Sequence, residues 1–218
     1  MELQNLLLKL DTIFQSEGES VYAVGGAVRD YLLGRPLYDF DFATSATPEI
    51  MKKLFPEGNF AFAKYGNVSI ELDGKHLEIT TLREEEYGET RHPSKITFVK
   101  EVKLDAKRRD FTINAMYLTP AGRLIDFYGG HHDLNIELIR MIGDPFERLK
   151  EDPLRILRAL RFKLTLGFKL EEQLEQAIIK LAPLVKSLNP QKANSEIAKM
   201  REIDEEKANQ ILNKYGIH

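Results

Sequence analysis

The sequence contains no cysteine, which excludes a disulfide framework and any metal site built from thiolates. No apolar run approaches the roughly 20 residues that a membrane span requires, so no membrane partner is expected. Residues 1–15 do not resemble a signal peptide, because Glu2, Lys9 and Asp11 interrupt the apolar positions. Internal repeats and low-complexity tracts are also lacking. These absences together predict a cytoplasmic protein.

An excess of positive charge is lacking too: the net charge is −3 over 218 residues, which argues against a general basic coat for nucleic acid. Local basic tracts, such as residues 107–109, can still contact phosphates. The five histidines show no metal-ligand spacing with carboxylates and are interpreted as ordinary surface or core residues. The length fits one domain with a helical appendage.

Residues 21–43, VYAVGGAVRDYLLGRPLYDFDFA, form the most informative stretch. They predict a strand, a turn at Gly25-Gly26, a helix over 27–33, and a second strand that carries Asp39 and Asp41. Side chains alternate across a strand, so both carboxylates lie on one face while the flanking phenylalanines face a core. Two like charges at this spacing are tolerated chiefly when a cation bridges them, and Mg²⁺ suits such oxygen ligands.

A glycine turn that admits a phosphate, followed by a metal-binding strand, is typical of nucleotidyl transfer. Mg²⁺ on Asp39 and Asp41 would activate a 3′-hydroxyl and neutralise charge on the α-phosphate and the leaving pyrophosphate. Glu78, on a neighbouring predicted strand, is the candidate third carboxylate. The alternative is that all three are solvated surface carboxylates.

The remaining pattern predicts an α+β fold: a small mixed sheet with helices, followed by helices alone. Asp73-Gly74 favours a type I′ hairpin between two strands. Residues 83–95 lack an apolar period and are predicted to form a mobile loop. A domain boundary is expected near residue 140. The predicted helices before it are 2–15, 27–33 and 48–54, the strands are 21–24, 67–72, 75–81, 115–118 and 124–126, and only helices are predicted from residue 144 onward.

A second cluster of polar residues lies in residues 151–161, EDPLRILRALR. If a helix begins at Pro153 with Asp152 as its N-cap, then Asp152, Arg155 and Arg158 share one face. An aspartate acceptor beside an arginine donor can meet the edge of a nucleobase, while further arginines reach a triphosphate. The alternative is a solvated arginine stripe. Similarly, Arg109 either contacts a phosphate or ribose, with Asn114 orienting the local backbone, or belongs to an ordinary basic turn.

These segments resemble the ordered motifs of class II tRNA nucleotidyltransferases, the CCA-adding enzymes and bacterial poly(A) polymerases of the polymerase β-like superfamily. The resemblance covers about residues 20–165. The matching segments are Gly25-Gly26-Ala27-Val28-Arg29-Asp30, Asp39-Phe40-Asp41, Arg108-Arg109-Asp110-Phe111-Thr112-Ile113-Asn114, and Glu151-Asp152 with Arg155, Arg158 and Arg161.

The resemblance implies a nucleotidyltransferase head over residues 1–140 and a helical neck with a nucleotide-selecting helix over residues 141–218. It implies Mg²⁺ on Asp39 and Asp41, CTP and ATP as substrates, and the tRNA 3′ end as acceptor. The loop at 83–95 looks like the flexible loop that switches such enzymes from C to A. The residues that the resemblance assigns to the nucleotide are Gly26, Arg29, Arg109, Asp152, Arg155, Arg158 and Arg161.

The chain departs from the family pattern in two respects. Family members usually continue into body and tail domains that hold tRNA, so missing C-terminal domains or a partner are expected to supply that function. In addition, Gln191-Lys192 stands where the family usually has Glu-Arg, although Glu196 and Lys199 fit better. Three alternatives remain open: an A-adding enzyme, a poly(A) polymerase, and a head that binds NTP or RNA without efficient turnover. A purely structural helical scaffold does not explain the paired aspartates.

Overall fold

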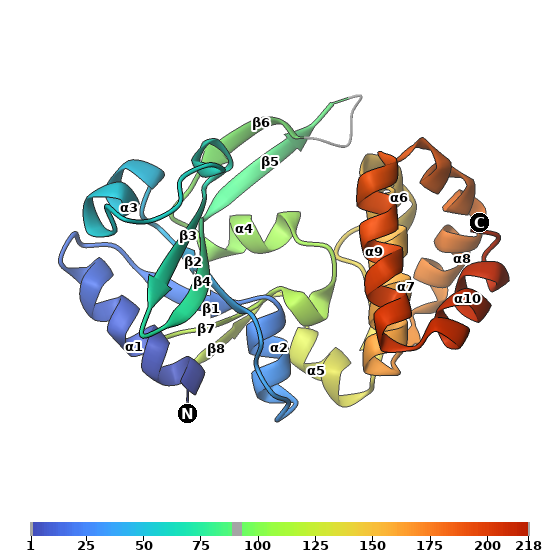
Figure 1. Cartoon of the computed structure of the whole chain (residues 1–218), viewed down its shortest axis with the longest axis horizontal. Coiled ribbons are helices and arrows are strands. Elements are labelled where there is room, and N and C mark those ends of the chain that lie inside the picture. The colour runs from blue at the N-terminus through green and yellow to red at the C-terminus, as the bar shows by residue number, and fades with distance from the viewer. Residues whose placement is uncertain (1, 89–92, 218) are drawn as a thin grey trace. The chain divides into compact units, whose positions relative to one another are not determined.

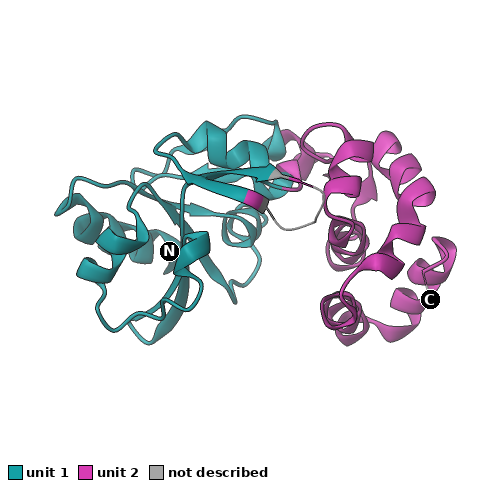
Figure 2. Ribbon diagram, turned by 90° about the horizontal axis from the view of Figure 1, so that it is seen from above, with its two compact units in different colours: residues 1–86, 95–109, 113–131 teal, residues 87–94, 110–112, 132–218 magenta. Residues whose placement is uncertain are grey.

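The computed structural model describes residues 2–88 and 93–217, and the chain divides into two compact units (Figure 2). Unit 1 contains residues 1–86, 95–109 and 113–131, and unit 2 contains residues 87–94, 110–112 and 132–218. Reading the two parts as head and neck stays a prediction. Among the described residues, no helix is long and apolar enough to cross a membrane.

Unit 1 is built on a six-stranded sheet of order β3-β4-β2-β1-β7-β8 (Figure 1). β2 and β4 run parallel, whereas the other neighbours are antiparallel. The predicted mixed sheet and α+β fold are therefore confirmed. The strand bounds are β1 (Val21–Val24), β2 (Phe40–Thr44), β3 (Asn67–Leu72), β4 (Lys75–Thr81), β7 (Met116–Leu118) and β8 (Leu124–Asp126).

Helices accompany this sheet largely where the apolar spacing predicts them. The opening helix α1 buries five apolar side chains along one face, and α2 and α3 follow the first two strands. Two helices, α4 and α5, were not predicted. The bounds are α1 (Glu2–Gln15), α2 (Gly26–Leu32), α3 (Pro48–Leu54), η1 (Ala63–Tyr65), α4 (Val102–Arg108), η2 (Thr112–Asn114) and α5 (Gly130–Asn135).

The two faces of β2 have different surroundings. Phe40 and Phe42 are buried and pair in register with Leu77 and Ile79 of β4, which confirms the predicted core face. On the other face, Ala43 packs in a cluster with Ala106 of α4. Because alternate residues share a face, Asp41 lies on the side of the sheet that α4 covers.

The connection between β3 and β4 follows the predicted turn chemistry. Asp73 and Gly74 have φ values of 53° and 70°, the positive values that a type I′ turn requires at both central positions. The strands that they join have the predicted bounds.

The prediction of a loop at 83–95 is wrong for most of its length, and its predicted mobility stays a prediction. β5 (Arg83–Tyr87) and β6 (Pro93–Phe98) form a two-stranded sheet, here called the β5–β6 ribbon. The side chains of Arg83 and Glu85 are only 13% and 5% exposed, so the strand has one buried, charged face. Residues 89–92 of the predicted loop lie outside the described residues.

Unit 2 is mostly helical. Its helices are α6 (Pro145–Glu151), α7 (Leu154–Leu166), α8 (Glu172–Leu181), η3 (Ala182–Ser187), α9 (Pro190–Ile203) and α10 (Glu205–Lys214). The prediction of helices alone after residue 144 is wrong at β10 (Lys169–Leu170), which pairs parallel with β9 (Leu138–Ile139). The side chains of Asn189 and Asp204 cap α9 and α10 by accepting from Gln191 N and Lys207 N, as expected for these residue types.

Candidate functional site

Three predicted site elements of unit 1 share one small space. A β-carbon built on Gly25 would lie 3.3 Å from Oδ2 of Asp41 and 3.9 Å from Nη1 of Arg109. Gly25 has φ 71° and ψ −139°, a conformation that L side chains rarely adopt. Glycine at this position therefore meets two requirements, a backbone conformation and a close approach to charged groups.

The carboxylates lie on and beside β2. Asp41 is in the strand, whereas exposed Asp39 immediately precedes it, so the strand begins one residue later than the predicted pair requires. Glu78 is the register partner of Asp41 on β4. Burial raises the pKa of the Asp41 carboxyl; Asp39 and Glu78 add to the rise, while Arg109 and Arg29 oppose it.

The donor set fits Mg²⁺ through two carboxylates. In residues 2–88 and 93–217, no group of three or more histidine, cysteine, aspartate or glutamate side chains is arranged to hold a metal ion. Mg²⁺ commonly takes one or two carboxylates and completes its shell with water and substrate phosphates. Burial and the nearby carboxylates Asp39 and Glu78 raise the pKa of Asp41, and a bound cation would favour its ionised form. Asp39 and Asp41 would therefore hold the ion.

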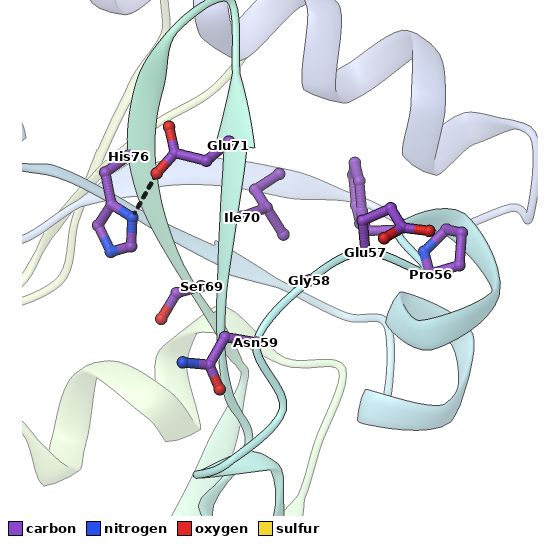
Figure 3. Close-up of a pocket in the computed structure, with 9 residues that line it drawn as sticks. Pro56, Glu57, Gly58, Asn59, Ser69, Ile70, Glu71 and His76 are labelled. Atoms are coloured by element: carbon purple, nitrogen blue, oxygen red, sulfur yellow. Dashed lines mark hydrogen bonds and ion pairs between the residues drawn. The ribbon is translucent and has the colours of Figure 1, made fainter.

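Glu78 has its own protein partners. Its Oε1 accepts from Ser69 Oγ at 2.7 Å and lies 3.0 Å from His76 Nε2. His76 Nδ1 also lies 2.9 Å from Glu71, the contact drawn in Figure 3. Ser69, Glu71 and His76 line a cavity of about 440 Å³ together with residues 55–59. The role of Glu78 as a third carboxylate stays a prediction.

Arg29 of α2 is buried and held on two sides. Its Nη1 donates to Oδ1 of Asn114 at 2.8 Å, and its Nε and Nη2 donate to the two carboxylate oxygens of Asp30 at 3.0 and 2.8 Å. Nη2 also lies 3.5 Å from the position of a Gly26 β-carbon. Asn114 therefore orients a side chain that is predicted to contact the nucleotide, rather than only the local backbone.

Arg109, at the end of α4, is fixed by two groups that sequence reasoning missed. Its Nε donates to the Tyr117 hydroxyl at 2.8 Å, and its Nη2 donates to Oδ2 of Asp105 at 3.0 Å. The hydroxyl of Tyr117 in turn donates to Oδ2 of Asp105 at 2.5 Å. Burial raises the pKa of Tyr117, as does Asp105, so the phenol stays protonated. Arg109 is thus an anchored cation rather than part of a loose basic turn.

The predicted arginines of unit 2 lie on α7 and are paired. Arg155 is buried and donates to the Arg148 carbonyl at 2.7 Å. Arg158 Nε donates to Oδ2 of Asp110, and Arg161 Nε donates to Oε2 of Glu196, both at 2.7 Å. The alternative of a solvated arginine stripe is therefore wrong. Contact of these arginines with a nucleotide stays a prediction.

The predicted N-cap at Asp152 is wrong, because Pro153 takes that position in α7 and Asp152 is the C-cap of α6. The Oδ1 of Asp152 still accepts from Leu154 N at 3.1 Å. The helix begins at Leu154, one residue later than predicted, which is within the ordinary uncertainty of helix ends. Glu196 is buried and also accepts from Lys199 at 3.4 Å. Of the two residues that fit the family pattern in α9, Glu196 thus braces Arg161, and Lys199 pairs with Glu196.

Comparison with known proteins shows the family to which this chain belongs. A family model described as "Poly A polymerase head domain" matches residues 21–140. The chain belongs to this family. It is similar to the CCA-adding enzyme of Enterococcus faecalis, with 42% identity over 85% of this chain and 46% of that protein, and to that of Geobacillus stearothermophilus, with 41% identity over 85% and 46%. The chain spans about half the length of the curated relatives it matches.

Solved structures of CCA-adding enzymes have a similar fold to this member of the poly A polymerase head family. The crystal structure of the Bacillus stearothermophilus CCA-adding enzyme in complex with CTP matches with TM-score 0.90 and 36% identity, covering 100% of this chain and 53% of that one. The Thermotoga maritima CCA-adding enzyme complexed with tRNA matches with TM-score 0.78 and 28% identity, covering 98% and 50%.

Of the two residues missed in this family member, Asp105 has a local signal in the sequence. Asp105 precedes Arg108 and Arg109 by three and four positions, and all three interact. This is the spacing at which helical side chains meet. Recognising residues 102–108 as a helix would have identified Asp105, whereas Tyr117 becomes a partner only through the β1–β7 pairing.

Proposed function

We propose that the chain carries the catalytic head of a Mg²⁺-dependent, template-independent tRNA nucleotidyltransferase. It adds CMP and AMP from CTP and ATP to the tRNA 3′ end and releases pyrophosphate. The observation that carries the proposal is the space shared by Gly25, Asp41 and Arg109. Because tRNA is the proposed substrate, the cytoplasm is the proposed location.

In the proposed reaction, different residues of unit 1 hold the metal ion, leave space for a phosphate and bind the triphosphate. Bound Mg²⁺ would supply charge neutralisation and activation of the attacking hydroxyl. Asp39 and Asp41 would hold the ion, and Gly25 keeps the space above Asp41 open for a phosphate. Arg109, fixed by Asp105 and Tyr117, provides a positioned cation for the triphosphate, because a pre-oriented guanidinium loses little entropy on binding.

Base selection is proposed for α7. Asp152 and Arg155 would read the edge of CTP or ATP, and Arg158 and Arg161 would assist. The pairing of Arg158 with Asp110 and of Arg161 with Glu196 supports this role, since braced side chains present a fixed pattern of donors. Contacts to tRNA beyond its 3′ end are proposed to come from a partner or from further domains like those of the longer relatives.

The test is incorporation of labelled CTP and ATP, each alone and together, into tRNA that ends before CCA, with Mg²⁺ and with EDTA. Metal-dependent addition of C, C and then A is expected. Addition of A alone to tRNA ending in CC identifies an A-adding enzyme, and long A tracts identify a poly(A) polymerase. Nucleotide binding without any incorporation means that the chain binds NTP without efficient turnover, and a lack of binding refutes the proposal.

Replacing Gly25 by alanine is expected to lower incorporation about a hundredfold, because misplacing reacting groups by about 1 Å has an effect of this order. The added β-carbon meets Asp41 at 3.3 Å. Gly34→Ala is the matched control: Gly34 has φ 64° and nothing within 4 Å of its β-carbon position. Alanine strains the backbone at both positions, because both glycines have positive φ. Equal losses of incorporation in the two variants would therefore show that the contact with Asp41 is irrelevant.

A further inference from the structure

The base of the β5–β6 ribbon, residues 83–86 and 95–98, belongs to unit 1 and carries charged side chains that contact α4. A two-stranded sheet is marginally stable by itself, and β5 has the sequence Arg-Glu-Glu-Glu-Tyr, without an apolar face. Arg83 and Glu85 point to the buried side, where Arg83 also donates to Asn67 Oδ1 at 2.8 Å. Figure 1 shows the ribbon beside α4. Ion pairs thus hold the β5 side of the ribbon, while Phe98 of β6 packs against Gly66.

Glu85 lies between two arginines. Its Oε1 accepts from Arg83 Nε at 2.8 Å and from Arg108 Nη1 at 3.2 Å. Burial lowers the pKa of Arg83, and the charge of Arg108 lowers it further, which shows that the two cations repel. Glu85 is therefore the carboxylate that keeps Arg83 and Arg108 together at the base of the ribbon.

Arg108 is also shared with Asp105. Oδ1 of Asp105 accepts from Arg108 Nε at 2.8 Å, while Oδ2 binds Arg109 and Tyr117. The carboxylates of Glu85 and Asp105 thus both bind the guanidinium of Arg108. Without the charge of Glu85, Arg108 would lose one of its two carboxylate partners in this cluster, and its stronger attraction to Asp105 would weaken the contact of Asp105 with Arg109.

We propose that Glu85 is a positioning residue for Arg109: through Arg108 and Asp105 it ties the β5–β6 ribbon to the cation beside Asp41. The inference rests on the proposed function, since it assigns Arg109 to the nucleotide triphosphate. It deepens that function by making nucleotide affinity depend on the attachment of the ribbon. Three contacts, all at 3.2 Å or less, connect the ribbon base to the site: Glu85 with Arg108, Arg108 with Asp105, and Asp105 with Arg109.

The experiment is a double-mutant cycle with Glu85→Gln and Arg108→Gln, read out as the dissociation constants of Mg·ATP and Mg·CTP by calorimetry. Glu85→Gln is expected to weaken binding about tenfold, the order of one charge-assisted hydrogen bond. In the Arg108→Gln background the same change is expected to have no further effect, because Glu85 acts through Arg108. The Arg109 Nε–H signal in NMR is expected to shift in Glu85→Gln alone.

Glu86→Gln is the matched control, because it removes the same charge from the neighbouring position, where Glu86 pairs with exposed Lys95. Its nucleotide affinity is expected to match that of the wild type. If Glu85→Gln fails to fold by circular dichroism, Glu85→Asp replaces it in the cycle, with a smaller loss and the same lack of effect beside Arg108→Gln.

The outcomes separate this inference from the proposed function. Additive effects of the two substitutions, or an unchanged Arg109 signal, overturn the role of Glu85 while the proposed function stands. Wild-type protein that binds neither nucleotide overturns both. Non-additive loss of affinity together with a shifted Arg109 signal supports the positioning role.

Discussion

Asp41→Asn is expected to lower nucleotide incorporation about a thousandfold or more while leaving the fold intact, since the metal's contribution to the transition state amounts to several kcal/mol. Asparagine keeps the size of the side chain but loses the charge that holds the ion. The measurement is the initial rate of CMP addition under saturating nucleotide, with circular dichroism as the check on folding.

The thermal stability of Asp41→Asn is not expected to fall with its rate of incorporation. The pKa of Asp41 is raised, so the folded protein binds this proton more tightly than the unfolded chain, and the ionised form opposes folding at neutral pH. A neutral asparagine avoids this cost. Without metal, the variant is expected to unfold at an equal or higher temperature than the wild type.

Asp73→Asn is the matched control for Asp41→Asn. Asp73 is half-exposed in the β3–β4 turn, pairs with Lys9, and has φ 53°, which asparagine also tolerates. Its rate is expected to equal that of the wild type. Substantial incorporation by Asp41→Asn, or an equal loss in Asp73→Asn, would contradict the assignment of Asp41.

Asp105→Asn is expected to reduce the free energy of unfolding by about 3 to 5 kcal/mol, the range for removing one partner of a buried ion pair. Asp105 is fully buried and binds Arg108, Arg109 and Tyr117. The neutral amide leaves two partly buried guanidinium groups without their shared carboxylate. Urea unfolding of the variant, beside the same Asp73→Asn control, gives the difference.

The difference in unfolding free energy between the wild type and Asp105→Asn is expected to shrink at acidic pH. Burial alone would raise the pKa of Asp105, but Arg108, Arg109 and the Tyr117 hydroxyl bring it well below the ordinary value. The stabilisation is therefore complete above the ordinary aspartate pKa of about 4 and is lost as the pH falls toward the lower folded pKa. The gap between wild type and variant is expected to narrow only in that acidic range; a gap that is already closed at neutral pH would contradict it.

The sequence predicted those parts of unit 1 whose pattern is local. The β3–β4 hairpin follows from Asp73-Gly74, and the placement of Phe40 and Phe42 in a core follows from strand alternation. The β5–β6 ribbon was missed because its buried face is made of Arg83 and Glu85, which hydrophobic periodicity scores as solvated. Helix α4 was missed for a related reason: its most buried polar residue, Asp105, occupies a core position.

The partners of the α7 arginines could not be predicted from their own helix. Arg158 binds Asp110, which lies 48 residues earlier, and Arg161 binds Glu196, which lies 35 residues later. Spacing along α7 reports only which arginines share a face. Whether such a face is solvated or paired depends on elements that the fold brings to it. The pairing excludes the solvated stripe, and contact with a nucleotide stays a prediction.

The position of β2 inside the sheet has a consequence for the precision of catalysis. Hydrogen bonds to β1 on one side and β4 on the other fix the register of this strand. A slip by one residue would turn Phe42 toward the site and Asp41 into the apolar core. The proposed metal ligand is therefore located by the backbone ladder of the sheet, and its alignment with an incoming phosphate is as reproducible as the pairing of the strands themselves.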